Sequence, residues 1–342
     1  MTDKMQPEYI RDAWYVAAWG EELTDTPLAR SILGEPVALY RGDSGVVGAL
    51  EDCCPHRMAQ LSQGVVEGDN LRCGYHGLMF DCTGTCKEIP GQPNIPPRAH
   101  ARHYPLVERW NLVWIWMGDP AAANPDLIPE WLWLDHPKWA FSHGIIQYDC
   151  NYILLVDNLI DLSHTTFVHK QTIGTYDVAR TPVKTERRNG TVYVERIMND
   201  TTPSPLYRKA GGFEGKVDRW QKIFYEAPGN IVIEAGAVPV GTNDPSRGID
   251  TRIINYLTPE TENSVFHFWA FARDFALDDS DMTEMLAGQI TLTFNEDKVL
   301  LDGQQVNLTA RPSQRLLDNN ADSGVVMARR LLAERLAAEA AR

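Results

Sequence analysis

Two short loops that each carry a cysteine and a histidine constrain this 342-residue chain more than any other feature. The first loop is Cys54-Pro55-His56, and after sixteen residues the second follows as Cys73-Gly74-Tyr75-His76. Proline and glycine in both loops favour tight turns. Two such loops can bring two thiolate sulfurs to one iron and two imidazole nitrogens to a second iron.

This ligand order predicts a Rieske [2Fe–2S] cluster, in which two histidines replace two cysteines on one iron and raise the reduction potential. A structural zinc site is the alternative, because a Cys2His2 set also suits zinc. The order Cys-His-Cys-His with C-x-H spacing differs from that of common zinc fingers and favours the Rieske cluster. The C-x-H spacing also identifies Cys54, and not the adjacent Cys53, as the cluster ligand. We expect the other cysteines to be small core residues: Cys53, Cys82, Cys86 and Cys150.

The segments around these loops predict short strands and no long helix. Val37 to Tyr40, Val46 to Leu50 and Leu112 to Trp116 are strand-like runs separated by turn residues. We therefore expect an all-β domain over residues 1–117. Gly118 to Pro129, which contains proline and alanine, is the predicted linker at the start of a second domain, residues 118–342.

The second domain predicts both helices and strands, so the fold class is α+β. Residues 151–169 have helical spacing, with Leu155, Leu159 and Leu162 on one apolar stripe. Asn189-Gly190 predicts a hairpin turn, and Thr258-Pro259-Glu260 predicts the turn between the last two strands. The predicted strands are Ile231 to Ala235, Thr251 to Leu257 and Ser264 to Ala272, and the predicted helices are Asp281 to Leu308 and Val325 to Ala341.

A second metal site is predicted near His164 and His169. Two histidines five residues apart lie about 140° apart on an ideal helix, so they can share a metal only where the helix is distorted or ends. The β-branched Thr165 and Thr166 favour an end between them.

A carboxylate would complete the two-His-one-carboxylate set of non-haem Fe(II) oxygenases. Asp297, on the late helix, is the leading candidate, and Glu296 and Asp302 are the alternatives. Alone, the D-x-x-H-x-x-x-x-H pattern from Asp161 to His169 is weak evidence for a metal site. It gains weight because it follows a Rieske motif in the same chain, since an iron–sulfur donor and an open iron site make one electron path.

With these motifs in view, the chain resembles the Rieske non-haem iron oxygenases, in particular the group of vanillate and dicamba O-demethylases and toluenesulfonate methyl-monooxygenase. The resemblance covers nearly the whole chain, and its metal motifs do not depart from the family pattern. It includes four further segments: Arg11 to Val16, Trp114 to Pro120, Val217 to Gln221 and Leu257 to Thr261.

The resemblance implies a catalytic domain built on an antiparallel sheet with flanking helices, and iron ligands at His164, His169 and Asp297. It also implies a head-to-tail homotrimer in which the cluster of one subunit lies near the iron of the next. Asp161 would bridge His76 of one subunit to His164 of its neighbour, and Asn158 would lie close to the iron.

Two substrate contacts are also expected. Asn230 stands where some relatives contact the substrate, as the resemblance implies. His267 lies in a predicted strand near the expected pocket. A contact with the substrate is one interpretation of this histidine, and a position in the core is the favoured one.

The resemblance thus implies the terminal oxygenase of a monooxygenase system in aromatic catabolism. The expected reaction is O2-dependent hydroxylation of the methoxy group of a vanillate-like aromatic acid, which releases formaldehyde. Hydroxylation of an aryl methyl group is the alternative, and a Rieske electron carrier is an alternative of another class. A separate NADH-dependent flavin/iron–sulfur reductase is the expected electron donor.

Composition narrows the partners further. Lys plus Arg is 32 and Asp plus Glu is 46, so the net charge of −14 argues against nucleic acid or an anionic membrane as partner. The first residues carry charges and no apolar run, and no segment is apolar over the ~18 residues of a membrane helix. We therefore expect a cytoplasmic protein with no membrane partner.

Overall fold

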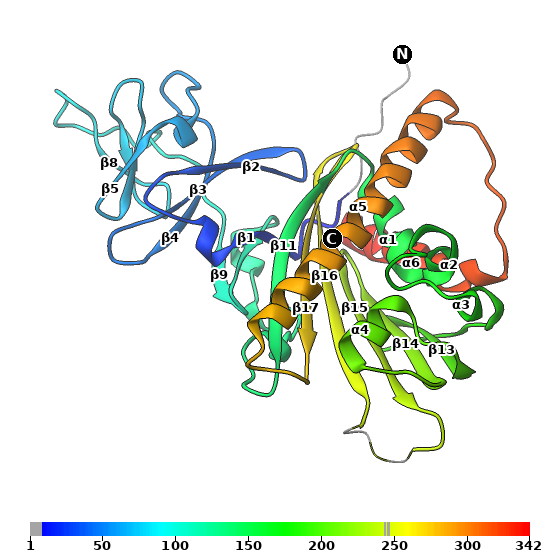
Figure 1. Cartoon of the computed structure of the whole chain (residues 1–342). Helices are drawn as coiled ribbons and strands as arrows, with labels where there is room; N and C mark the ends of the chain where they lie inside the picture. The colour runs from blue at the N-terminus through cyan, green and yellow to red at the C-terminus, as the bar shows by residue number, and fades with distance from the viewer. Residues whose placement is uncertain (1–8, 243, 245–246) are drawn as a thin grey trace. The chain divides into compact units, whose positions relative to one another are not determined.

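The computed structural model describes residues 9–242, 244 and 247–342, and it divides into two compact units (Figure 1). The first unit comprises the described residues up to Pro129 together with Thr258–Glu262, and the second comprises Glu130–Leu257 and Asn263–Arg342. The first is built from strands and short 3-10 turns, and the second from one large sheet with helices. The predicted α+β class is confirmed.

The first unit contains three small antiparallel sheets. One joins β1 (Trp14–Trp19), β10 (Leu112–Trp116) and β9 (Leu106–Arg109). The second joins β2 (Leu28–Ile32), β3 (Glu35–Arg41) and β4 (Val47–Glu51). The third joins β5 (Val65–Glu67), β6 (Asn70–Arg72), β7 (Met79–Phe80) and β8 (Cys86–Glu88). All three strands predicted for this region are confirmed.

The second unit is built on a seven-stranded sheet in the order β11-β17-β16-β15-β14-β13-β12. Neighbouring strands pair antiparallel from β12 through β16, as do β11 and β17. The predicted hairpin is confirmed, since Asn189 and Gly190 both have positive φ, 51° and 80°. The strands are β11 (Ala140–Tyr148), β12 (Lys184–Arg188), β13 (Thr191–Thr201), β14 (Val217–Glu226), β15 (Asn230–Pro239), β16 (Ile249–Thr261) and β17 (Ser264–Arg273).

Helices pack against this sheet, and in Figure 1 the long helix α5 lies across the strands at the β11–β17 side. Its N-terminus is capped by Asp279, whose carboxylate accepts a hydrogen bond from the Met282 N–H at 2.8 Å. α6 packs on the opposite edge, against β12 and β13. The helices are α1 (Tyr152–Ile160), α2 (Thr165–Val168), α3 (Tyr176–Arg180), α4 (Pro205–Gly211), α5 (Ser280–Ala310) and α6 (Ser323–Ala340). Both predicted late helices are confirmed to within a few residues.

Two expectations about local structure are wrong. The helix that precedes the two histidines ends at Ile160, before His164, and not between His164 and His169, where Thr165 and Thr166 lie. It ends there because Asp161 is extended (φ −105°, ψ 99°) and its carboxylate caps the Ser163 N–H at 2.9 Å, which starts a separate turn.

The predicted turn at Thr258-Pro259-Glu260 is part of strand β16, which continues to Thr261. The carbonyls of Pro259 and Glu260 accept hydrogen bonds from the Leu33 and Gly34 N–H groups, 2.8 and 2.9 Å away. Proline can occupy this strand because the backbone here serves as acceptor, so no proline N–H is needed.

None of the helices in the described part of the chain combines the length and hydropathy that a membrane crossing requires.

Candidate metal sites and substrate pocket

The first unit brings the two Cys/His loops together with matching geometry. The Met58 N–H donates to the Cys54 carbonyl at 2.9 Å, and the Gly77 N–H donates to the Cys73 carbonyl at 3.0 Å. Met58 and Gly77 both have positive φ, 60° and 75°, so each loop turns back on itself directly after its ligand pair.

The donor atoms of these loops fall into two groups. Cys54 and Cys73 are buried in the core of the unit, with 1% and 2% of their surface exposed, whereas His56 and His76 are exposed. The two imidazole rings lie 4.6 Å apart, centroid to centroid. Burial, together with the adjacent Cys73 thiol, raises the pKa of Cys54 to about 11. Two neighbouring buried thiols and two neighbouring exposed imidazoles are the donor set of a Rieske [2Fe–2S] cluster.

The remaining cysteines are free thiols with different environments. Cys86 and Cys150 are buried, as expected of small core residues. Cys82 is partly buried and packs against the core of the first unit. Cys53 is also partly exposed, with its sulfur 3.4 Å from the sulfur of Met58, so it is not a core residue.

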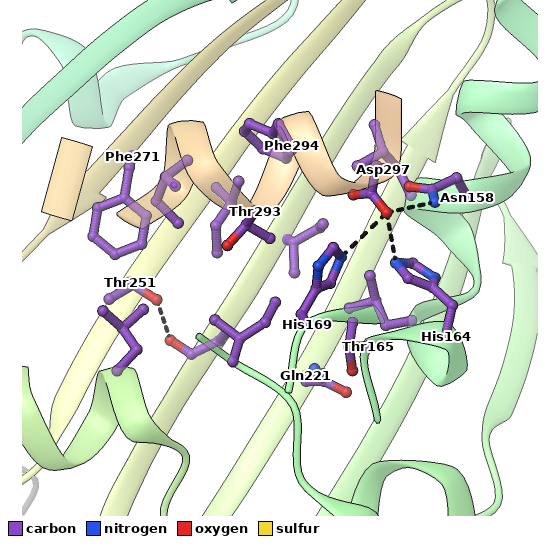
Figure 2. Close-up of a pocket in the computed structure, with 18 of the residues that line it drawn as sticks. Asn158, His164, Thr165, His169, Gln221, Thr251, Phe271, Thr293, Phe294 and Asp297 are labelled. Atoms are coloured by element: carbon purple, nitrogen blue, oxygen red, sulfur yellow. Dashed lines mark hydrogen bonds and ion pairs between the residues drawn. The ribbon is translucent and has the colours of Figure 1, made fainter. Parts of the chain in front are cut away.

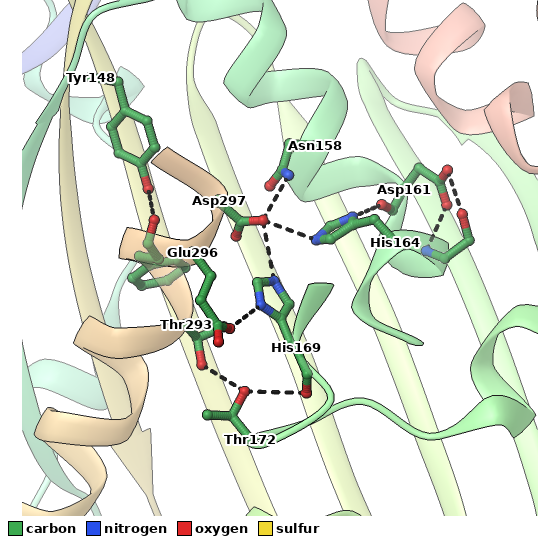
Figure 3. A network of polar contacts seen from close by, with 11 residues as sticks. Tyr148, Asn158, Asp161, His164, His169, Thr172, Thr293, Glu296 and Asp297 are labelled. Atoms are coloured by element: carbon green, nitrogen blue, oxygen red, sulfur yellow. Dashed lines mark hydrogen bonds and ion pairs between the residues drawn. The ribbon is translucent and has the colours of Figure 1, made fainter. Parts of the chain in front are cut away.

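The second unit brings His164, His169 and Asp297 to one point, with their ligand atoms all within 4.8 Å of one another. Nε2 of His169 lies 3.2 Å from Oδ1 of Asp297, and Nε2 of His164 lies 3.4 Å from the same oxygen. The break at Asp161 turns the two histidines toward this oxygen, as Figure 3 shows. The side chain of Asn158, on α1, donates to the same oxygen at 3.1 Å.

Both histidines are held in the tautomer that a metal requires. Nδ1 of His164 lies 2.7 Å from the backbone carbonyl of Asp161, which can only accept, so Nδ1 carries the proton. Nδ1 of His169 lies 2.7 Å from the Glu296 carboxylate and donates to it (Figure 3). The Nε2 lone pairs of both rings therefore point toward Asp297, where a metal ion can use them.

The structure also distinguishes the three carboxylates considered for this site. Asp297 faces the histidines, whereas Glu296 lies behind His169 as its hydrogen-bond acceptor. Asp302 accepts hydrogen bonds from the Asp149 N–H and the Lys298 ammonium, at 2.9 and 2.7 Å. It is not one of the three side chains that converge on the candidate iron site.

The electrostatics of this site follow from burial and from these contacts. Burial would raise the pKa of Asp297, but the close contacts with the His164 and His169 rings outweigh burial and hold that pKa well below its usual value. Burial would lower the pKa of His169, but Asp297 and Glu296 outweigh it and raise that pKa. Asp297 is therefore ionised, as a metal ligand must be.

A largely apolar pocket with about 630 Å³ of empty volume lies beside the three side chains (Figure 2). Figure 2 shows His164, His169 and Asp297 at one side and Thr251 and Phe271 at the other. Its apolar walls include Leu159, Leu162, Ile173, Leu206, Ile233, Ala235, Ile253, Phe271, Ile290 and Phe294.

Neither of the two expected substrate contacts lines this pocket. Asn230 accepts a hydrogen bond from Trp131 at 3.0 Å and donates to Glu226 at 2.9 Å, so its amide is used within the fold. His267 is fully buried, lies 2.9 Å from Asn255 and packs its ring 4.6 Å from that of Phe294. Burial lowers the pKa of His267 to about 3, so this side chain is neutral.

Several polar residues of the pocket were not anticipated from the sequence. Arg219 and Gln221 on β14 and Tyr207 on α4 line it, together with Thr251 and Thr293. The available signal was strand alternation, because Val217, Arg219, Gln221, Ile223 and Tyr225 are the buried set of β14. An arginine and a glutamine on the buried face of a strand indicate a polar function there.

Comparison with known proteins agrees with this geometry. The Rieske [2Fe-2S] domain model matches residues 13–105, and the vanillate O-demethylase oxygenase C-terminal domain model matches residues 148–338. The toluene-4-sulfonate monooxygenase system iron-sulfur subunit of Comamonas testosteroni is 41% identical over 97% of this chain and 98% of its own length. The vanillate O-demethylase oxygenase subunit of a Pseudomonas strain is 37% identical over 97% and 96%.

Solved structures agree as well. Dicamba monooxygenase bound to 3,6-dichlorosalicylic acid is 36% identical, with a TM-score of 0.94, over 98% of this chain and 100% of that one. The same enzyme with non-heme iron and dicamba gives a TM-score of 0.87 at 35% identity, with the same coverage.

Proposed function

We propose that this chain, which belongs to the Rieske non-haem iron oxygenases with a vanillate O-demethylase-type C-terminal domain, hydroxylates the methoxy carbon of an aromatic acid. The observation that carries the proposal is the cluster of His164, His169 and Asp297 at one side of an apolar pocket. Such a pocket can hold an aromatic ring with one substituent next to the metal ligands.

In this proposal Cys54, His56, Cys73 and His76 hold the [2Fe–2S] cluster. The burial of the two cysteines and the exposure of the two histidines support the assignment, because these residues would hold one iron inside the unit and the other at its surface. Electrons can then enter and leave through the histidine side.

His164, His169 and Asp297 would hold the mononuclear iron. Iron held by these residues would supply the activation of O2 for hydroxylation. Asn158 keeps the Asp297 carboxylate in place through its 3.1 Å hydrogen bond. The apolar residues around the site exclude water, which protects the reacting carbon from side reactions.

Asp161 is assigned two tasks. Its backbone carbonyl orients His164, and its carboxylate accepts from the Ser163 N–H and hydroxyl at 2.9 and 2.8 Å. A carboxylate has further lone pairs, so it can also accept a hydrogen bond from His76 of a neighbouring copy. We propose that this link, in a head-to-tail homotrimer, carries electrons from the cluster of one subunit to the iron of the next.

The position of the reacting carbon decides the product. Hydroxylation of a methoxy carbon gives a hemiacetal, which breaks down to a phenol and formaldehyde. Hydroxylation of an aryl methyl group gives a stable alcohol. This second reaction is the alternative, and the 41% identity with the toluene-4-sulfonate monooxygenase subunit supports it.

A separate reductase is part of the proposed system. Two electrons and two protons are needed to place one oxygen atom of O2 in the product and to release the other as water. An NADH-dependent flavin/iron–sulfur reductase would supply the electrons in the cytoplasm. Residues 1–117 would accept these electrons, and residues 118–342 would carry the oxygenase site.

A pure electron carrier is the contrasting function. It has no use for the three convergent side chains and the pocket of the second unit. Iron content separates the two, because a carrier binds two irons per chain through its cluster and an oxygenase binds three.

Formaldehyde release from vanillate tests the proposal. Purified, iron-loaded protein is supplied with NADH, O2 and a compatible reductase, and formaldehyde and protocatechuate are measured together. Equal amounts of both products are expected. Formation of 4-(hydroxymethyl)benzenesulfonate from toluene-4-sulfonate, without formaldehyde from vanillate, would replace O-demethylation with aryl-methyl hydroxylation. Two irons per chain and no turnover of either compound would leave the electron carrier.

A further inference from the structure

We propose that Arg219 binds the anionic substituent of the aromatic substrate, a carboxylate or a sulfonate, on the side of the pocket away from His164, His169 and Asp297. This inference rests on the proposed function and specifies its substrate class. Arg219 lines the pocket from β14, and its side chain is buried, with 2% of the residue exposed.

Within the described part of the chain, the hydrogen bonds of Arg219 are with neutral groups. Nη1 donates to the Thr175 hydroxyl at 3.3 Å, and Nη2 donates to the Ile173 carbonyl at 3.1 Å. Its guanidinium lies 4.8 Å from the centroid of the Tyr207 ring. Its buried Nε has no hydrogen-bond partner, and no carboxylate in the described parts of the chain forms an ion pair with it.

A buried charge without a counter-charge is costly, so its position in a ligand pocket indicates that the ligand supplies the counter-charge. The partly buried Arg252 shows the usual solution, with ion pairs to Glu234 and Asp250 at 3.3 and 2.6 Å. Arg273 is buried and forms no ion pair with any residue that the structure describes, but it does not line the pocket and it donates to backbone carbonyls before α5.

Gln221, the next inward-facing residue of β14, adds a neutral donor. Its Oε1 accepts from Nη1 of the buried Arg196 at 3.1 Å, which leaves its amide NH2 as the group that can donate into the pocket. Arg196 also places a second positive charge behind Gln221. The Thr251 hydroxyl, in contrast, already donates to the Ala235 carbonyl at 2.5 Å.

Strand register places the backbone of Arg219 beyond the part of the sheet nearest the metal ligands, while its guanidinium contacts the segment that follows His169. His267 is level with Asn255 and packs on Phe294, one helical turn before Asp297. Thr251 stands four residues before Asn255 on the same strand, and it is level with Ala235 and Gln221. Arg219 lies two residues further along, about 7 Å at ~3.3 Å per residue.

A substrate with its anion at Arg219 therefore points the opposite side of its ring toward the metal ligands. Carboxylate and sulfonate both match a guanidinium with two parallel hydrogen bonds. The pocket would then hold the ring in one orientation and present one carbon to the site of hydroxylation.

Two ligand pairs of nearly equal shape test the anchor: vanillate with vanillamide, and toluene-4-sulfonate with toluene-4-sulfonamide. Dissociation constants are measured by calorimetry on iron-loaded protein at pH 7, where both amides are neutral. For Arg219→Met we expect at least one of the two anions to bind on the order of 10- to 100-fold more weakly, because charge-assisted hydrogen bonds are lost. The matching amide should change by less than about threefold. The pair that responds identifies carboxylate or sulfonate as the anion.

Arg273→Met is the matched control, since it removes a buried arginine of the same unit from outside the pocket. It should leave the ratio of anion to amide affinity unchanged. An unchanged ratio in folded Arg219→Met, with cluster absorption and iron content intact, would overturn the anchor. Should that variant not fold, the wild-type protein decides, because equal affinity for both members of each pair also overturns it.

Turnover separates this inference from the proposed function. Formaldehyde or alcohol formed from the amides as efficiently as from the acids would remove the anchor and keep the oxygenase. Charge-selective binding that depends on Arg219, without oxidation of any of the four compounds, would keep the anion site and remove the proposed reaction.

Discussion

Glu296 is expected to determine how tightly iron is held, although its carboxylate does not face the metal site. It accepts the Nδ1 proton of His169 at 2.7 Å, and His169 has only 1% of its surface exposed. Replacement by alanine leaves this buried N–H without its acceptor. The ring can then shift its proton to Nε2, where it competes with iron, or turn away from Asp297.

The magnitude follows from the lost contact. Loss of an outer hydrogen-bond partner of a metal-binding histidine lowers metal affinity about 10- to 100-fold. At 1.4 kcal/mol per tenfold this is roughly 1.4–2.8 kcal/mol. The cost of an unsatisfied buried donor, about 1–3 kcal/mol, agrees with this range. Glu296→Gln keeps an acceptor but loses the charge, so we expect the lower end of the range.

Competition with a ferrous chelator measures the effect, with iron and cluster absorption determined on the same sample. Asp302→Asn is the control, because this carboxylate stands on the same helix but pairs with Lys298 and the Asp149 N–H. Iron binding of Glu296→Ala equal to that of wild type would refute the reasoning. Loss of iron in Asp302→Asn would refute the assignment of Asp297 as the ligand, Glu296 as the acceptor from His169, and Asp302 as a residue outside the iron site.

Three further predictions use other parts of the molecule. Asp161→Asn should leave both metal centres bound and stop turnover, because it removes the charge of the proposed bridge; normal turnover of an iron-loaded variant would contradict that role. Burial lowers the pKa of His267 to about 3 in the folded protein, whereas in the unfolded chain this side chain takes up a proton near pH 6.5. The free energy of unfolding should therefore decrease as pH falls below about 6.5. Between pH 7 and pH 5 urea unfolding should show a loss of about 2 kcal/mol that is absent in His267→Gln, and equal pH dependence of the two proteins would argue against it. Gly324→Ala should destabilise the second unit by roughly 1–2 kcal/mol, because its Cβ would lie 2.5 Å from Cγ2 of Val194. Gly303→Ala, where a Cβ meets nothing within 4 Å, should stabilise by about 0.5–1 kcal/mol in the same thermal or urea measurement, and the opposite order would show that the packing argument is wrong.

Short-range spacing made part of the site predictable. Cys54 with His56 and Cys73 with His76 stand in pairs that a single loop can turn toward one two-iron cluster, and the loops have this form. Asp297 is different, because it lies more than one hundred residues after the histidines. Adjacent helix residues point about 100° apart, so the spacing alone could not choose between Asp297 and Glu296. The packing of α5 decides that choice.

Contacts between distant segments explain what the sequence did not show. The turn expected at Pro259 was wrong because its carbonyl serves an N–H of Leu33, a partner more than two hundred residues away. Asn230 was expected near the substrate but is held between Trp131 and Glu226. Local patterns describe one strand at a time, whereas the lining of a pocket depends on which strands lie side by side.

The two sides of the pocket therefore differ in how they can vary. The metal side depends on linked contacts, because His169 needs Glu296 and Asp297 together. The proposed anion side depends mainly on Arg219, whose hydrogen bonds in the described part of the chain go to Thr175 and Ile173 and not to these three residues. The distance between the two sides sets which carbon of an anchored ring reaches the site of hydroxylation, and a methoxy carbon stands one bond further from the ring than a methyl carbon. If Arg219 anchors the substrate as proposed, the apolar residues between the two sides would select between O-demethylation and methyl hydroxylation.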